Sequence, residues 1–285
     1  MRTDNNEHKA LFTIPTAAHS SALANIKPLP EQRRITGHKQ TDAYLWVLEV
    51  IRLNEPAHLG AAEEALQKLT IKPKDAEKRY RDWLLINGAD PFQITFGTIG
   101  MDNPARAIQT ARENIAKAAG IRGVFGSYES ALEYVEAELV IQSSPKYIDD
   151  YDWGWTDAEL KAGYIGGGRM NEIDDQRREL VEGYRDVLPE PYTLSDVVRE
   201  LIYWDWLYSA RNTAAKELGH QFGPDQHTSV NDRERYLEKL LATIKPSTRT
   251  EATEVCRWVL ENERLNDLGE DTNAIIINLV GECEQ

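Results

Sequence analysis

Apolar side chains recur at intervals of three and four residues along most of the chain, the spacing that places them on one face of an α-helix. Candidate helices are bounded by cap residues such as Ser195 and by breaks such as Pro56 and Gly88. The pattern therefore predicts an all-α fold, an irregular helical bundle with at most one or two short strands. The expected helices cover residues 41–55, 61–69, 74–87, 103–119, 127–142, 171–187, 195–218, 231–243 and 250–268.

Two segments depart from the helical pattern. Residues 90–99, DPFQITFGTI, alternate apolar with small or polar side chains and are the best strand candidate. A single short strand has no obvious partner, so an ordered loop is the alternative. The apolar run at residues 275–280 fits either a strand or a helix that docks onto the core.

Residues 41–55 and 253–267 resemble each other, because both contain Trp-Val-Leu-Glu followed by Arg-Leu-Asn. Thr41 and Thr253 are the expected N-caps, each followed by an acidic residue. The motif Thr-Ile-Lys-Pro also occurs twice, at residues 70–73 and 243–246. These recurrences suggest duplicated helical hairpins, with chance similarity between helical sequences as the alternative. The first copy is apolar nearly all round and is expected deep in a core.

The composition along the chain suggests four parts. Residues 1–40 carry six Lys and Arg against three Asp and Glu, with scattered proline, and are expected to form a flexible, mildly basic arm. Residues 41–142 and 169–285 are the expected N-terminal and C-terminal helical domains. Residues 143–168 are an acidic, aromatic and glycine-rich connection between them.

The net charge of −14 disfavours direct contact with nucleic acid or anionic membranes. The basic arm is the one candidate for nucleic acid binding. Cys256 and Cys283 form no CxxC pair and belong to no metal-ligand cluster, as expected in a reducing compartment. The sequence shows neither a signal peptide nor an apolar run long enough for a membrane helix. We therefore expect a cytoplasmic protein with no membrane insertion and no cofactor.

Two features are candidates for a protein-binding surface. One is the acidic stretch from Glu129 to Glu159, and the other is the aromatic helix from Ser195 to Leu218. Trp and Tyr with a nearby Arg are typical interface anchors, although core packing and a solvated acidic face are the ordinary alternatives. The candidate interaction residues are Glu133, Glu136, Asp149, Asp150, Asp152, Trp206 and Arg211.

Enzymatic chemistry has weaker support in the sequence. The loop Gly166, Gly167, Gly168 and Arg169 precedes a helix and could bind an anion, but it lacks the phosphate-loop and dinucleotide fingerprints, so a hinge is the alternative. His220 and His227 flank Asp225 in a Gly-Pro turn, where a polar loop is favoured over a metal site. We predict no catalytic, cofactor-binding or metal-binding residue.

The run Thr-Gly-His-Lys-Gln-Thr-Asp-Ala-Tyr-Leu-Trp-Val-Leu-Glu at residues 36–49, with Ala-Asp-Pro-Phe-Gln at residues 89–93, resembles one known family. That family, KilA/KlaA, is encoded by the first gene of the kil/kla tellurite-resistance operon of broad-host-range conjugative plasmids. The resemblance implies a plasmid accessory protein linked to tellurite resistance or to host or fertility inhibition, without catalytic residues. The expected function is non-enzymatic binding of a host or plasmid protein. The alternatives are an enzyme or ligand-binding protein that uses residues 166–169 for an anionic substrate, and an acidic DNA mimic that inhibits a host nucleic-acid-binding protein.

Overall fold

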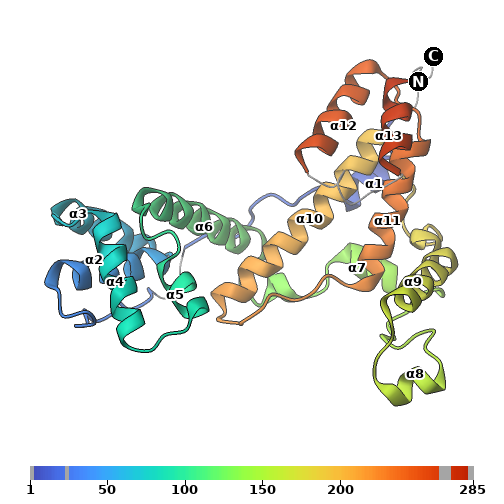
Figure 1. Ribbon diagram of the computed structural model, residues 1–285. Coiled ribbons are helices and arrows are strands. Elements are labelled where there is room, and N and C mark those ends of the chain that lie inside the picture. Colours follow the sequence, from blue (N-terminus) through green and yellow to red (C-terminus); the bar gives the residue numbers. More distant parts are fainter. Residues whose placement is uncertain (1–2, 23–25, 263–270, 282–285) are drawn as a thin grey trace. The chain divides into compact units, whose positions relative to one another are not determined.

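The computed structural model describes residues 3–22, 26–262 and 271–281, and all regular structure in these ranges is helical (Figure 1). The all-α prediction is therefore confirmed. The elements are α1 (Asn6–Leu11), α2 (Lys39–Arg52), α3 (Pro56–Lys68), α4 (Pro73–Ile86), α5 (Pro91–Thr98), α6 (Pro104–Phe125), η1 (Ser130–Leu132), α7 (Glu136–Gln142), α8 (Asp157–Ala162), α9 (Gly167–Val181), η2 (Glu182–Tyr184), α10 (Leu194–Glu217), α11 (Thr228–Thr243), α12 (Arg249–Glu261) and α13 (Asp271–Val280).

The chain folds into two compact units, and one interrupts the other. Residues 1–15 and 132–285 form the first, here called the terminal unit, and residues 16–131 form the second, the inserted unit. This division differs from the predicted one, in which residues 143–168 connected two domains. The first fifteen residues, predicted as part of a flexible arm, instead contribute α1, and its neighbour Phe12 is fully buried in the terminal unit.

The core of the inserted unit surrounds α2, which packs against α3, α4 and α6. As its composition predicts, α2 is buried on most sides, with Tyr44, Val47 and Ile51 at 2% exposure or less. The helix begins at Lys39 with His38 as its N-cap, so the prediction of Thr41 as the cap is wrong.

The strand predicted at residues 90–99 is wrong, because this segment forms α5. Asp90 accepts a hydrogen bond from the Gln93 amide at 2.9 Å, and the Gln93 side chain accepts one from the Asp90 amide at 3.1 Å. This capping box satisfies amides that a short helix otherwise leaves without partners. With Pro91 as the first helical residue, these local bonds favour a helix over the alternating pattern.

Several other helix boundaries also differ from the prediction, since α3 begins at Pro56 and α9 runs from Gly167 to Val181. Helix α6 continues through Gly120 to Phe125 and ends at Gly126, whose positive φ of 82° suits a residue without a side chain. The single helix predicted over residues 127–142 is two shorter elements, η1 and α7.

In the terminal unit, the 24-residue α10 packs against α1, α11 and α12, and α13 covers α11 and α12. Residues 275–280, for which the sequence left strand and helix open, belong to α13 and are helical. Helix α12 begins at Arg249 with Thr248 as its N-cap, so the prediction of Thr253 as the cap is wrong. The two similar Trp segments also differ in burial, since Leu48 of α2 is 4% exposed and the matching Leu260 of α12 is 65% exposed. Whether they arose by duplication stays a prediction.

Candidate functional site

The predicted acidic residues are exposed side chains of the terminal unit. Glu133 precedes α7 and Glu136 begins it, and Asp149, Asp150 and Asp152 lie in the segment between α7 and α8. Asp149 and Asp150 border a hollow of about 220 Å³ that Arg177 and His227 also line. The structure therefore places these carboxylates where a solute can reach them.

Arg211 does not belong to an exposed surface, and this part of the prediction is wrong. It is 8% exposed and forms a fork on the buried Glu138 carboxylate, with both N···O distances at 2.6 Å. A third bond, of 2.7 Å, joins Arg211 Nη2 to the Glu133 carbonyl oxygen. Trp206 is half-buried and packs against Tyr203 with ring centroids 5.7 Å apart. The aromatic part of α10 is thus mainly core packing.

The glycines at 166–168 start a helix and do not form the predicted break. Gly166 is the N-cap of α9, and Gly167 and Gly168 form its first turn. Arg169 donates to the Gly154 carbonyl oxygen at 3.0 Å and pairs with Glu159 and Glu172, each at 3.3 Å. Because these carboxylates compensate its charge, Arg169 adds little to attract an anion.

His220 and His227 lie at the two ends of the loop before α11. His227 is the N-cap of α11 and packs on the Tyr134 ring, with centroids 5.0 Å apart. Across residues 3–22, 26–262 and 271–281, no three His, Cys, Asp or Glu side chains form a group that could hold a metal ion. Cys256 is half-buried in α12, and Cys283 lies outside the described residues.

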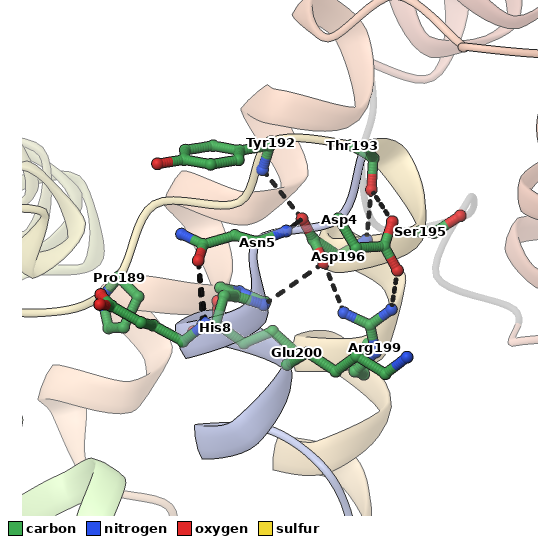
Figure 2. A network of polar contacts seen from close by, with 12 residues as sticks. Asp4, Asn5, His8, Pro189, Tyr192, Thr193, Ser195, Asp196, Arg199 and Glu200 are labelled. Atoms are coloured by element: carbon green, nitrogen blue, oxygen red, sulfur yellow. Dashed lines mark hydrogen bonds and ion pairs between the residues drawn. The ribbon is translucent and has the colours of Figure 1, made fainter. Parts of the chain in front are cut away.

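A buried polar network that the sequence analysis missed fastens α1 to α10, and Figure 2 shows this part of it. The network continues to α11 through Arg233. His8 of α1 places Nε2 2.8 Å from Oε2 of Glu200 in α10, and both side chains are fully buried. Arg233 of α11 donates Nε and Nη2 to the same carboxylate at 2.8 and 2.9 Å. Arg233 also donates Nη1 to the Gly183 carbonyl oxygen at 2.9 Å. Glu200 therefore joins three separate segments of the terminal unit.

The other half of the network surrounds Asp196 at the start of α10. Its Oδ2 accepts the backbone amides of Asn5 and Tyr192 at 2.9 and 3.0 Å. Arg199 bridges Asp196 to Asp4, and the Asp4 carboxylate also accepts the Thr193 hydroxyl at 2.8 Å (Figure 2). The N-terminal segment is thus held at both its backbone and its side chains.

Two carboxylates of this network, Glu200 and Asp4, are stabilised in their ionised form. Burial alone would raise the pKa of Glu200, but the Arg233 guanidinium and the His8 hydrogen bond hold it below the ordinary value for a glutamate. Burial also acts to raise the pKa of Asp4, and bonds from Thr193 and Arg199 lower it overall. Both carboxylates are therefore ionised at neutral pH and serve as fixed acceptors.

Beside this network lies a cavity of about 550 Å³ between α1, α10 and α12. Its size is in the range of pockets that take drug-sized ligands or several side chains. The apolar walls come from α10, α12 and the segment that follows α1: Phe12, Ile14, Val198, Ile202 and Val255. The polar lining consists of Lys9, Thr13, Ser195, Arg199, Glu251 and Glu254.

Two of the charged groups in the cavity wall are already engaged. Glu251 Oε1 accepts the amide and the hydroxyl of Ser195 at 2.9 and 3.0 Å, and its Oε2 accepts the Ser247 amide at 2.6 Å. Arg199 is held by Asp4 and Asp196. Lys9 and Glu254 are exposed at the rim. The arrangement provides apolar area and a charged edge.

Comparisons of the chain with protein-family models, with curated proteins and with solved structures found no match.

Proposed function

We propose that this is a non-enzymatic binding protein whose terminal unit receives the apolar face of a cationic partner helix in the cavity between α1, α10 and α12. The observation that carries the proposal is this cavity of about 550 Å³, walled by three helices and lined by five large apolar side chains. Grooves of this kind bind amphipathic helices by accepting their apolar side chains.

The state of the polar groups supports binding over catalysis. Ser195 donates its hydroxyl to Glu251, and both oxygens of Glu251 accept hydrogen bonds. Glu251 thereby ties Ser195, in the first turn of α10, to Ser247, just before α12. His8, the histidine of the polar network, is fully buried and bonded to Glu200. These groups hold the wall of the cavity in place.

The charge of the terminal unit favours a cationic partner. This unit carries 18 Lys and Arg side chains against 34 Asp and Glu, so its net charge of −16 is larger in magnitude than the −14 of the whole chain. Exposed Glu254 lies at the cavity rim, and Glu133, Glu136 and Asp149 are exposed elsewhere on the unit. Complementary charge speeds encounter and selects among partners.

The resemblance to the KilA/KlaA family fits this proposal. A plasmid accessory protein that acts on its host without catalytic residues needs a host or plasmid protein to bind. The DNA-mimic hypothesis is a version of the same proposal, in which the basic partner is a nucleic-acid-binding protein. The enzyme alternative at residues 166–169 has no supporting observation, since Arg169 is paired with acids.

A fluorescent amphipathic peptide of leucine and lysine is a suitable probe, with a leucine and glutamate peptide of the same pattern as its opposite-charge control. We expect anisotropy titration to show that the cationic peptide binds the full chain. Ile202→Trp, which fills the cavity, should weaken binding at least tenfold. Ile276→Trp on α13 is the matched control, because Ile276 is 44% exposed against 39% for Ile202 and lies outside the cavity lining.

Equal binding by Ile202→Trp and wild type would show that the peptide does not bind in the cavity. Equal binding of the acidic and the cationic peptides would show that charge does not select the partner. No binding of the cationic peptide by the wild-type chain would contradict the proposal itself.

A further inference from the structure

The inserted unit exposes a group of large apolar side chains on the α4–α5 hairpin. Five such residues fall within fifteen positions. Their exposed fractions are 58% for Leu85, 84% for Ile86, 76% for Phe92, 69% for Phe96 and 65% for Ile99. Exposed apolar residues are ordinary when scattered, but a group of this kind marks an interaction surface.

The packing of the hairpin explains why these side chains face outward. Tyr80 and Leu84 of α4 lie against Gly97 of α5, where an added Cβ would be 3.3 Å from Leu84 Cδ1. The small Gly97 lets the two helices approach closely, and α5 uses this side for the contact. Phe92 and Phe96 are four residues apart and share one helix face, and both are exposed.

A basic stripe of α4 runs toward the apolar group. Lys74, Lys78, Arg81 and Leu85 follow one another at intervals of four, three and four residues, which places them along one stripe of the helix. The three basic side chains are exposed, and Arg81 pairs with Glu77. The neighbouring stripe, with Asp75, Arg79 and Asp82 before Ile86, is mixed in charge. Glu77 also lies on the stripe that ends at Leu85, three residues after Lys74 and four before Arg81, so the positive charge that it leaves uncompensated is that of Lys74 and Lys78.

We propose that this hairpin is a peripheral membrane contact, in which the apolar group enters the interface of an anionic phospholipid surface and the Lys74–Arg81 stripe meets the lipid head groups. Apolar side chains flanked by Lys and Arg are the arrangement by which proteins bind such surfaces from one side. The inserted unit can approach a negative surface because it carries 15 Lys and Arg against 13 Asp and Glu. The overall charge of −14, which predicts repulsion, belongs to the other unit.

The contact is interfacial. In the part of the chain that the structure describes, no helix is both long enough and apolar enough to cross a lipid bilayer. Helix α5 has only eight residues, far fewer than the ~20 that a transmembrane helix needs. The hairpin therefore adds a surface contact without a spanning segment.

Vesicle flotation with the full chain tests the proposal, using phosphatidylcholine vesicles with and without phosphatidylglycerol. The wild type should float with the anionic vesicles, less so with neutral ones, and high salt should weaken the binding. Phe92→Ser with Phe96→Ser should lower the bound fraction at limiting lipid at least tenfold. Lys74→Glu with Lys78→Glu should remove the preference for anionic lipid.

Phe222→Ser with Tyr151→Ser is the matched control, because these terminal-unit side chains are 79% and 81% exposed. It should float as the wild type does. Circular dichroism of each variant confirms that the helices remain. Absence of wild-type flotation with either vesicle overturns the proposal, as does equal loss in the control. If the wild type instead shows concentration-dependent self-association in light scattering that the phenylalanine variant abolishes, the hairpin is an interface between copies of the chain. Either result leaves the cavity proposal intact, because that cavity belongs to the terminal unit.

Discussion

The two units use buried charge in different ways. In the terminal unit, buried charges pair across helices: Arg233 with Glu200, Arg211 with Glu138, and Arg177 with Asp232. In the inserted unit, the buried acids accept backbone amides, as Asp196 and Glu251 also do in the terminal unit. Asp42 accepts the amides of Thr36 and Gly37 at 2.7 and 3.2 Å, and Glu55 accepts that of Lys27 at 3.0 Å.

This difference shows what each unit has to specify. A buried ion pair adds little net stability over an apolar pair, but removal of one partner leaves an expensive unpaired charge. Such pairs therefore penalise every arrangement in which the helices dock differently. The terminal unit joins a segment from one end of the chain to helices nearly 200 residues away, and the cavity wall depends on that docking. The inserted unit is continuous in sequence, and its buried acids order the loops that precede α2 and α3.

Arg233→Ala should have the largest effect on stability. It leaves Glu200 buried without its guanidinium, and the expected loss is about 3–5 kcal/mol in the unfolding of the terminal unit. Urea denaturation followed by circular dichroism measures it. Arg235→Ala in the same helix is the control, because its side chain is 46% exposed and its pair with Glu238 is expected to contribute at most about 1 kcal/mol. Similar losses in the two variants would mean that the network of Figure 2 does not hold the unit together.

The acid dependence of stability should depend on Glu200. Because the folded state lowers its pKa, the ionised carboxylate stabilises the fold above the unfolded value, and this contribution is lost as the pH falls through the folded value. We expect wild type to exceed Glu200→Gln in stability at neutral pH. The gap should shrink as the pH drops below about 4, near and under the ordinary glutamate pKa. Denaturation midpoints from pH 7 to pH 3 give the comparison. A difference in stability between wild type and Glu200→Gln that widens toward acid would contradict the lowered pKa of Glu200.

Asp42→Ala should have a smaller effect, confined to the inserted unit. It removes the acceptor for two partly buried amides and the Thr36 hydroxyl, and we expect a loss of about 1–3 kcal/mol. Asp75→Ala is the control, since Asp75 lies in the first turn of α4 and is exposed. Hydrogen exchange should show faster exchange around residues 36–42 in the first variant alone. Faster exchange throughout the terminal unit would contradict the separation of the two units.

Helical periodicity predicted the long helices well, because each needs one apolar face that is visible within its own sequence. Helix α2 was correctly placed in a core because its sequence is apolar nearly all round. Helix α5 was missed because its capping box competes with an alternating pattern, and the two signals occupy the same ten residues. Helix α1 has only six residues, too few to show a period.

The candidate site could not be predicted from the sequence, because the residues that build it are far apart along the chain. His8 and Glu200 are separated by 192 positions, and no pattern along the chain pairs them. The same reason explains why the burial of Arg211 was not predicted. The sequence places Arg211 near aromatic residues on a helix, but its partner Glu138 is 73 positions away. The exposed acids were easier, since a run of carboxylates with few cations must remain solvated.

Photo-crosslinking tests the central claim most directly. The photoreactive residue benzoylphenylalanine would replace Ile202 at the cavity or Ile276 on α13, and each full chain would be irradiated with the fluorescent leucine and lysine peptide. The cavity proposal predicts a crosslinked product from position 202 that an excess of unlabelled peptide suppresses, and little or none from position 276. A product from position 276 with none from position 202 would show that the partner binds elsewhere on the protein.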